Sequence, residues 1–458
     1  MENKKLKEFE SQMNKKRVTV IGIGISNLPL IKYLVRLGAE VTARDKRTAE
    51  KLGDTYNDLK ALGVNLVLGD NYLEGIDAQI IFKTPGMRYD IPELNEARKK
   101  GSIVTSEMEV FFDVCPAHII GITGSDGKTT TTTLIYKMLE KQGYKTWLGG
   151  NIGNPLLIDT KKMNRQDYVV LELSSFQLHT MRKSPEIAVI TNISPNHLDM
   201  HKDYEEYIDA KKNIMKYQTE KNILVANSGN DITRKIGEEA KGEYRCFSSK
   251  NVALVYIEND TICYGSEKIL KISDIKIPGM HNVENYMAAI AAVHDLVSVE
   301  AINEIAKTFG GVEHRIELVR EKDGVRYYNS SIDSSPNRTI NTLKVFKDKV
   351  IMISGGKDKG IPYDDIGEPI INGVKTLILI GATAGVIEDA VNNAYKKLNI
   401  EPCVKILHAK EYKEAVSLAQ QNAKKGDIVL LSPASTSFDM FSNFEERGNL
   451  FKKLVNEL

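Results

Sequence analysis

The segment Thr123-Gly124-Ser125-Asp126-Gly127-Lys128-Thr129-Thr130 decides the fold. It lies between a predicted strand, residues 118–123, and a predicted helix, residues 130–142, that Gly143 closes. A glycine-containing turn at the start of a helix offers backbone N–H groups and the positive end of the helix dipole to an anion. Lys128 can then reach terminal phosphates, and the Thr129 hydroxyl can bind Mg²⁺. We therefore predict that residues 124–130 hold a phosphate-bearing ligand.

The match to the usual phosphate-loop motif is loose. The first glycine of a strict motif would fall at Ile122, although the strand, turn and helix follow one another as that motif requires. An ordinary glycine turn with an exposed lysine is the alternative interpretation.

Two side chains that suit a metal follow neighbouring strands of the same predicted sheet. Glu172 ends the apolar run 168–173, and His197 follows the apolar run 187–193. A carboxylate at a buried strand end is costly without a partner, and Mg²⁺ prefers oxygen ligands beside phosphates. We predict a shared metal site next to the turn; for His197, a surface or core histidine is the alternative.

The first 113 residues alternate predicted strands and helices, which favours a parallel sheet. Gly22 and Gly24 follow the first strand, and Asp45 lies about 20 residues beyond, where dinucleotide-binding folds place a ribose-binding acid. Asn27 replaces the third glycine of that fingerprint. Any nucleotide diphosphate could use the same helix N-terminus, and glycines that only allow tight packing are the alternative.

The 458 residues are predicted to form three domains, 1–113, 114–310 and 311–458. In the middle domain, Asn259-Asp260 within residues 252–264 predicts a hairpin and a small antiparallel sheet. In the last domain, three strands run into loops of small residues, where open α/β sheets bind ligands. The predicted class is α/β, with a Rossmann-like N-terminal domain, a central P-loop ATPase domain that has a parallel sheet plus a small antiparallel sheet, and a C-terminal Rossmann-like domain.

Composition excludes several classes of protein. Hydrophobic residues make up 42% of the chain and the net charge is +1, which is typical of a folded domain and gives no general attraction to nucleic acid or to a membrane surface. The cysteines are far apart and form no CxxC pair, so a zinc site or a disulfide framework is not indicated. A cytoplasmic location is the simplest expectation.

Further motifs give the chain a resemblance to the Mur ligases of peptidoglycan synthesis, over nearly its whole length. They are Gly149-Gly150-Asn151-Ile152-Gly153, Glu172 to Leu178, Asn192 to Asp199, Gly311 to Arg315, Ser432 to Asp439 and Asn443 to Gly448. Thr84-Pro85-Gly86 and Ser437-Phe438-Asp439 favour the branch that adds D-glutamate. The resemblance implies an ATP- and Mg²⁺-dependent cytoplasmic ligase, expected to be a monomer, that joins D-glutamate to UDP-N-acetylmuramoyl-L-alanine through an acyl phosphate.

The resemblance also implies a role for individual residues. Lys128, His197 and Lys211 would be catalytic, with Thr129, Glu172, His197 and carbamylated Lys211 around the metal. ATP would contact residues 124–130 and His281, Asn282, Asn285 and Arg315. The uridine-linked substrate would contact Ile25, Ser26, Asp45, Thr84, Gly86, Asn151, Ser174 and Gln177. D-Glutamate would contact Ser334, Lys359, Ser437, Phe438 and Phe444.

One departure and several rival interpretations stay open. The family usually has an acid where this chain has Ser330, and Asp333 is the candidate replacement. A sibling ligase that adds L-alanine, lysine or diaminopimelate, or that extends folate with glutamate, would share most of these motifs. A non-catalytic nucleotide-binding protein would also keep them. A dehydrogenase is disfavoured, because it explains neither the turn nor the third domain.

Overall fold

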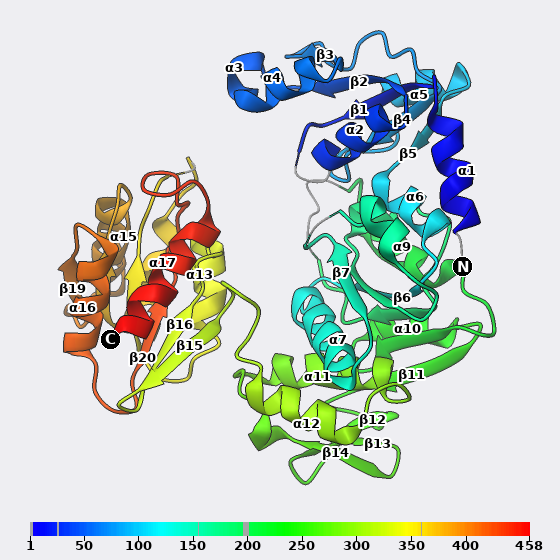
Figure 1. Ribbon diagram of the computed structural model, residues 1–458. Coiled ribbons are helices and arrows are strands. Elements are labelled where there is room, and N and C mark those ends of the chain that lie inside the picture. Colours follow the sequence, from blue (N-terminus) through cyan, green and yellow to red (C-terminus); the bar gives the residue numbers. More distant parts are fainter. Residues whose placement is uncertain (1–2, 25–26, 154, 196–200, 359) are drawn as a thin grey trace. The chain divides into compact units, whose positions relative to one another are not determined.

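The computed structural model describes residues 3–24, 27–153, 155–195, 201–358 and 360–458 (Figure 1). The chain forms two compact units. The first consists of Met1–Ile272 and Glu284–Ile305, and the second of Ser273–Val283 and Ala306–Leu458. The first unit holds two sheets and the second holds one. The domain boundaries expected at 113/114 and 310/311 stay a prediction. Within the described ranges, no helix is both long and apolar enough to cross a membrane.

The N-terminal sheet is parallel and has five strands. Their order is β3 (Asn65–Leu68), β2 (Glu40–Asp45), β1 (Arg17–Ile21), β4 (Ile80–Lys83), β5 (Ile103–Thr105). The strand order reverses between β1 and β4, the point at which open α/β sheets bind ligands. The helices are α1 (Lys4–Met13), α2 (Asn27–Arg36), α3 (Ala49–Leu52), α4 (Asp54–Ala61), α5 (Pro92–Lys99) and α6 (Glu107–Val114).

The central sheet has nine strands. Their order is β14 (Glu267–Lys271), β13 (Thr261–Tyr264), β12 (Val255–Glu258), β11 (Glu243–Phe247), β10 (Ile223–Asn227), β9 (Ile187–Ile190), β6 (His118–Thr123), β8 (Tyr168–Glu172), β7 (Thr146–Gly150). The strands from β7 to β12 are parallel, whereas β12, β13 and β14 pair antiparallel. The predicted hairpin is confirmed, since Asn259 and Asp260 take the φ angles of +45° and +62° that a tight hairpin turn needs.

Helices and short 3₁₀ segments connect the strands of the central sheet or follow its last strand along the chain, β14. They are α7 (Lys128–Gln142), η1 (Leu157–Lys162), α8 (Ser175–Leu178), α9 (Tyr204–Lys216), α10 (Asp231–Glu238), η2 (Ile272–Asp274), α11 (Met280–Val293) and α12 (Val299–Thr308). The middle strand β9 is buried along its whole length and β8 is buried beyond Tyr168, which explains why their sequences read as continuous apolar runs.

The C-terminal sheet lies in the second unit. Its order is β15 (Glu317–Lys322), β16 (Val325–Asn329), β20 (Ile428–Leu431), β17 (Val350–Ser354), β18 (Val374–Leu379), β19 (Lys405–His408). All pairs are parallel except β15 with β16, so an antiparallel edge strand is added to the expected doubly wound sheet. The connecting segments are α13 (Pro336–Leu343), η3 (Asp364–Ile366), α14 (Gly367–Gly373), α15 (Ala384–Leu398), α16 (Tyr412–Asn422) and α17 (Phe444–Glu457).

Helices cover both faces of this C-terminal sheet (Figure 1). Met352 and Leu430 pack with α14 and α15 in one core, whereas Ile353 and Val429 pack with α16 and α17 in the other. Alternate residues of a strand point to opposite faces, so both faces need apolar side chains. The α/β class with three sheets is confirmed.

Candidate active site

The glycine turn between β6 and α7 has no room for side chains at two positions. Gly124 has a φ of +150° and Gly127 a φ of +77°. A Cβ atom on Gly124 would lie 1.9 Å from the Thr191 hydroxyl oxygen, and one on Gly127 would lie 2.2 Å from the side-chain oxygen of Asn285. Only glycine fits both positions. The turn therefore packs closely against its neighbours and leads directly into the first turn of α7, where N–H groups lack helical partners.

The segment that follows β9 braces this turn. The N–H groups of Ser125 and Asp126 donate to the carbonyl and the side-chain oxygen of Asn192, at 2.9 and 3.0 Å. The hydroxyl of Thr191 donates to the Asp126 carbonyl at 2.6 Å, and the Ser125 hydroxyl donates to the Ser194 carbonyl at 2.9 Å. These bonds hold the turn in one shape, as an anion-binding site requires.

Lys128 lies over the turn that precedes it. Its Nζ donates to the carbonyl oxygens of Gly124 and Ser125, at 3.0 and 2.9 Å. Both acceptors are uncharged, and a phosphate oxygen forms a stronger, charge-assisted bond with an ammonium group. Lys128 is therefore placed to exchange these carbonyls for phosphate oxygens.

Lys211 is a buried lysine next to the same turn. Its side chain extends from α9 and is only 2% exposed. Its Nζ donates to the Gly124 carbonyl at 2.7 Å and lies 4.7 Å from the centre of the Tyr207 ring. Burial, and then the charge of Lys128, hold the pKa of Lys211 well below its ordinary value. A lowered pKa favours the neutral amine, which is the form that reacts with carbon dioxide.

Glu172, at the end of β8, has one carboxylate oxygen without a hydrogen-bond donor. The side chain is 2% exposed, and Oε1 accepts from Asn151 Nδ2 at 2.9 Å. Oε2 is buried and has no hydrogen-bond partner among the described residues. A buried, uncompensated carboxylate oxygen is costly, so this position fits a bound cation. Thr129, the predicted hydroxyl ligand at the start of α7, is also buried.

His197 lies outside the described residues. In the ranges that the structure describes, no group of three or more histidine, cysteine, aspartate or glutamate side chains could hold a metal ion. Glu172 is thus the one predicted carboxylate ligand whose surroundings fit a cation, and Mg²⁺ remains a proposal.

The carboxylate of Asp45 accepts hydrogen bonds from neighbouring loops. Its Oδ2 accepts from the N–H of Ile23 at 2.7 Å, and both carboxylate oxygens accept from the guanidinium of Arg47, at 2.8 to 2.9 Å. Burial opposes ionisation, but the hydrogen bonds and charge of Arg47 and the Ile23 N–H lower the pKa of Asp45 to about 2. The acid expected at a ribose therefore anchors the glycine turn after β1. Ile25 and Ser26, the neighbouring predicted residues, lie outside the described ranges.

A small cavity of about 30 Å³ in the first unit is lined by residues of both the N-terminal and the central regions. Its lining includes Asn27, Lys83, Pro85, Gly150 and Gln177. Pro85 stands between the predicted substrate residues Thr84 and Gly86, while Gln177 belongs to α8. Ser174 and Gln177 also form a reciprocal capping box at the start of that helix. The structure thus brings the Thr84–Gly86 loop close to Gln177.

Lys83 is a candidate residue that the sequence analysis missed. It is 3% exposed, and its Nζ donates to the Met87 carbonyl at 3.3 Å. Burial lowers the pKa of Lys83, and the charge of Glu109 opposes that shift. The available signal was a lysine that ends the apolar strand β4 directly before Thr84-Pro85-Gly86. A cation at this place suits an anionic substrate.

The ATP-base and D-glutamate candidates lie in both units. Asn285, in the first unit, accepts from the Thr131 hydroxyl at 3.2 Å. His281, Asn282 and Arg315 belong to the second unit. Of the D-glutamate candidates there, Ser334 follows β16 and Ser437 and Phe438 follow β20; these strands are neighbours, so their carboxyl ends meet. Phe444 begins α17, and its carbonyl accepts from the Ser331 hydroxyl at 2.7 Å. Lys359 lies outside the described residues.

Asp333, the candidate replacement for the acid usual at position 330, is buried beside the loop after β20. Its side chain is 4% exposed and accepts from the Ser432 hydroxyl at 2.7 Å. Burial raises the pKa of Asp333, although hydrogen bonds from Ser432, Thr342 and Ser330 oppose the shift. Asp333 therefore ties the loop after β16 to the loop after β20, and its replacement of the usual acid at a nucleotide stays a prediction. Ser330 is fully buried, and its hydroxyl accepts from the Ile316 N–H at 3.3 Å.

Comparison with known proteins accounts for most of the chain. Residues 16–106 match the Mur ligase MurD-like N-terminal domain, residues 122–293 the Mur ligase middle domain, and residues 314–435 the Mur ligase glutamate ligase domain. The chain belongs to the Mur ligase family. The predicted resemblance is confirmed.

Relatives within the Mur ligase family are similar over the full length. The chain is 57% identical to the UDP-N-acetylmuramoylalanine–D-glutamate ligase of Ruminiclostridium cellulolyticum, over 100% of both chains. It is 54% identical to the protein of the same name from Acetivibrio thermocellus, over 100% of this chain and 99% of that one.

Solved Mur ligase structures share the fold. UDP-N-acetylmuramate–alanine ligase MurC from Thermotoga maritima aligns over 96% of this chain and 99% of its own, with a TM-score of 0.59 and 18% identity. MurF from Acinetobacter baumannii aligns over 98% of both chains, with a TM-score of 0.58 and 15% identity.

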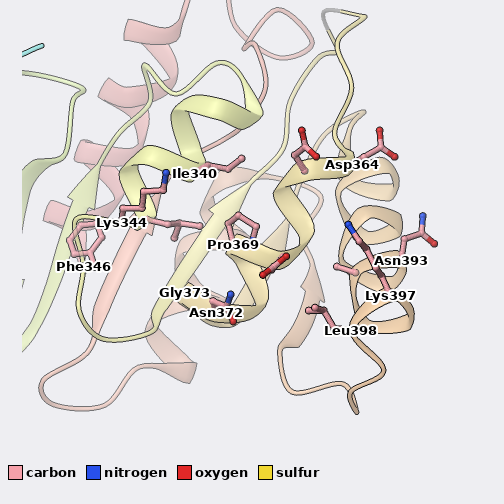
Figure 2. A pocket seen from close by; sticks show the side chains of 14 residues that line it. Ile340, Lys344, Phe346, Asp364, Pro369, Asn372, Gly373, Asn393, Lys397 and Leu398 are labelled. Atoms are coloured by element: carbon pink, nitrogen blue, oxygen red, sulfur yellow. The ribbon is translucent and has the colours of Figure 1, made fainter. Parts of the chain in front are cut away.

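One cavity in this Mur ligase involves none of the predicted residues. It has a volume of about 690 Å³ and lies in the second unit, beside α13, α14 and α15 (Figure 2). Phe346, Pro369 and Leu398 give it apolar surface, and Lys344 and Asp364 add charge. Its charged side chains are exposed, so the cavity offers no buried polar group that would select a ligand.

Proposed function

We propose that the chain is an ATP-dependent ligase that joins D-glutamate to UDP-N-acetylmuramoyl-L-alanine, as a step in making peptidoglycan precursors. The observation that carries the proposal is the arrangement of Lys128, Lys211 and the glycine turn around the Gly124 carbonyl, in a chain similar along its full length to ligases of that name. The reaction must activate a carboxylate, which is a poor electrophile, and ATP supplies the activation.

The first step forms an acyl phosphate. A carboxylate oxygen of the L-alanyl group attacks the γ-phosphorus of ATP, the bond to the β–γ bridging oxygen breaks, and ADP leaves. Negative charge spreads over the transferred group, so Lys128 and the N–H groups of the turn stabilise the transition state.

The second step forms the amide. The neutral amine of D-glutamate attacks the acyl carbon, and the resulting tetrahedral intermediate loses phosphate and a proton. Ser334, Lys359, Ser437, Phe438 and Phe444 are the proposed D-glutamate contacts. The proposed contacts of the uridine-linked substrate are Ile25, Ser26, Asp45, Thr84, Gly86, Asn151, Ser174 and Gln177, with Lys83 as an addition.

We assign a magnesium site to Thr129, Glu172, His197 and Lys211. Bound Mg²⁺ would offset charge on the phosphates. The unpartnered Oε2 of Glu172 fits such an ion. Lys211 becomes an oxygen ligand when its neutral Nζ attacks carbon dioxide, because a nitrogen–carbon bond forms, one proton leaves, and a carbamate anion results. The remaining proposed ATP contacts are Gly124 to Thr130, His281, Asn282, Asn285 and Arg315.

The setting of the enzyme completes the proposal. The chain would work in the cytoplasm as a monomer, on small-molecule substrates and without nucleic acid or membrane partners. Its domains would be 1–113 for the uridine-linked substrate, 114–310 for ATP and 311–458 for the amino acid.

The test is incubation with ATP, UDP-N-acetylmuramoyl-L-alanine and D-glutamate, followed by phosphate release and mass spectrometry of the product. We expect the mass of the amide and one phosphate per product. Parallel reactions with L-glutamate, L-alanine, lysine and diaminopimelate separate the sibling ligases. Binding of the uridine-linked substrate without phosphate release in any reaction would favour the non-catalytic alternative.

A further inference from the structure

Arg88, in the N-terminal region, forms an ion pair with Glu206 of the central region. Arg88 stands two residues after Gly86, and Glu206 lies in the first turn of α9. The guanidinium donates to both carboxylate oxygens, Nη1 to Oε2 at 3.1 Å and Nη2 to Oε1 at 3.0 Å. The Glu206 side chain is 18% exposed. Such a two-point pair fixes orientation as well as distance, and it is less exposed to solvent than an ordinary surface pair.

Glu206 itself is held firmly. Its Oε2 also accepts from the Lys202 N–H at 2.5 Å, and its own N–H donates to Asp203 Oδ1 at 2.8 Å. The hydrogen bonds and charge of Arg88 are the main cause that lowers the pKa of Glu206, to about 2. The carboxylate is therefore ionised at any pH used for assays. Five residues further along the same helix stands Lys211.

A second contact runs beside the first. The Tyr89 ring meets the His179 ring edge to face, with centres 4.7 Å apart. His179 follows α8 directly, and its Nε2 lies 3.6 Å from Glu206 Oε1. Burial lowers the pKa of His179, and Arg88 is the residue whose side chain meets both carboxylate oxygens of Glu206.

His201 links the helix α8 to the surroundings of Glu206. A hydrogen bond of 2.9 Å joins His201 Nε2 to the Ser175 hydroxyl, and the imidazole stacks on the Phe176 ring at 5.2 Å with an interplanar angle of 7°. His201 Nδ1 lies 3.7 Å from Glu206 Oε2. Glu206 thus lies among three elements: the loop after β4, the helix that carries Gln177, and the helix that carries Lys211.

We propose that Arg88 and Glu206 are a positioning pair that sets the substrate loop Thr84–Gly86 relative to Gln177 and to the helix of Lys211. Neither side chain is assigned a contact with a reacting atom. The pair would align the L-alanyl carboxylate of the substrate with the phosphate-binding turn, because the loop that holds one end of the substrate is fixed to the helix beside the turn. The inference rests on the proposed function.

The test is a double-mutant cycle with Arg88→Ala, Glu206→Gln and the two combined. We expect each single variant to lower kcat/KM for UDP-N-acetylmuramoyl-L-alanine between about 10-fold and about 100-fold, as misplacement by an ångström can. The KM for ATP should change by less than about twofold, because the turn is untouched. The double variant should be no worse than the worse single variant, since the two residues act as one unit.

Two further variants separate positioning from general stability. Arg88→Lys keeps the charge but loses the two-point grip, so it should recover only part of the loss. Asp77→Asn breaks another arginine–carboxylate pair of the same region, with Arg17, and should behave as wild type. Melting temperatures are recorded for all variants. Losses that are additive, that affect ATP equally, or that follow the melting temperature would overturn the proposal.

Calorimetric binding of UDP-N-acetylmuramoyl-L-alanine without ATP makes the two proposals distinguishable. Wild-type protein that binds this substrate but performs no ligation would contradict the proposed function and still allow the pair to be tested by affinity. Active wild-type protein with unchanged binding and turnover in all variants would contradict the positioning pair alone.

Discussion

Replacing Lys211 by methionine separates a chemical role from a structural one. Methionine has a similar length and no charge, and the side chain that it replaces is only 2% exposed. The acceptors of Lys211 keep other partners, because Lys128 Nζ still donates to the Gly124 carbonyl at 3.0 Å. The Thr123 hydroxyl still donates to the Leu173 carbonyl at 2.7 Å.

The expected loss of stability is therefore small. One hydrogen bond to a carbonyl contributes about 1 kcal/mol net, and replacing a buried polar group by an apolar one of similar size offsets part of that. We expect the melting temperature of Lys211→Met to stay within about 4 °C of wild type. Activity should respond very differently, because removing one preorganised group from a phosphoryl-transfer site lowers kcat about 10²- to 10³-fold.

The measurements are steady-state turnover, thermal unfolding, and nuclear magnetic resonance of protein incubated with isotopically labelled bicarbonate. Wild-type protein should show a carbamate carbon signal that Lys211→Met lacks, and bicarbonate should not restore turnover in the variant. A kcat within about threefold of wild type would refute the carbamate role. A loss of activity that only follows unfolding would refute the argument from burial.

Three other perturbations test neighbouring parts of the structure. Lys128→Ala should lower kcat by about 10²-fold or more and raise the KM for ATP, since a charge at the phosphates is removed; near-normal turnover would contradict the phosphate assignment. Gly127→Ala should abolish ATP binding measured by calorimetry, because its Cβ would lie 2.2 Å from the side-chain oxygen of Asn285. Gly143→Ala is the control: Gly143 also has a positive φ, but open space surrounds it, so this variant should bind ATP normally. Glu107→Gln should alter the pH dependence of stability, because burial raises the pKa of Glu107 from 4.5 to about 7. Between these two pH values the folded chain retains a proton that the unfolded chain loses. The free energy of unfolding of the wild type therefore falls by up to about 3 kcal/mol as the pH rises through that range. Urea unfolding at pH 5 and pH 8 should show a smaller fall in the variant.

Local patterns in the sequence were sufficient to predict several buried strands and the hairpin. The continuous apolar run at 168–173 marks a central strand because both faces of β8 are buried. The Asn259-Asp260 pair predicts the hairpin because both residues tolerate positive φ. The edge strand β15 was missed, since its residues are only partly buried and an edge strand shows weak hydrophobic alternation.

The site was predicted less completely, because the decisive facts are partnerships between residues far apart in sequence. Spacing placed Asp45 at a ribose, but it could not show that the carboxylate also accepts from Arg47 and from the Ile23 N–H. The acid missing at position 330 suggested Asp333 as a substitute, but the sequence could not show that Asp333 accepts from the Ser432 hydroxyl in the loop after β20. No local pattern reveals that Arg88 pairs with Glu206, because that contact depends on how two sheets pack within the first unit.

The Gly124 carbonyl explains why two lysines beside one turn can do different chemistry. It accepts from Lys128 at 3.0 Å and from Lys211 at 2.7 Å, and two ammonium groups that close repel each other. Lys211 is the more deeply buried of the two, so desolvation adds to that repulsion and its pKa falls. Lys128 is half-buried on the first turn of α7, where its Nζ can meet a phosphate oxygen. Carbamylation would replace the amine of Lys211 by a negatively charged carbamate. The repulsion between the two lysine side chains would then become an attraction.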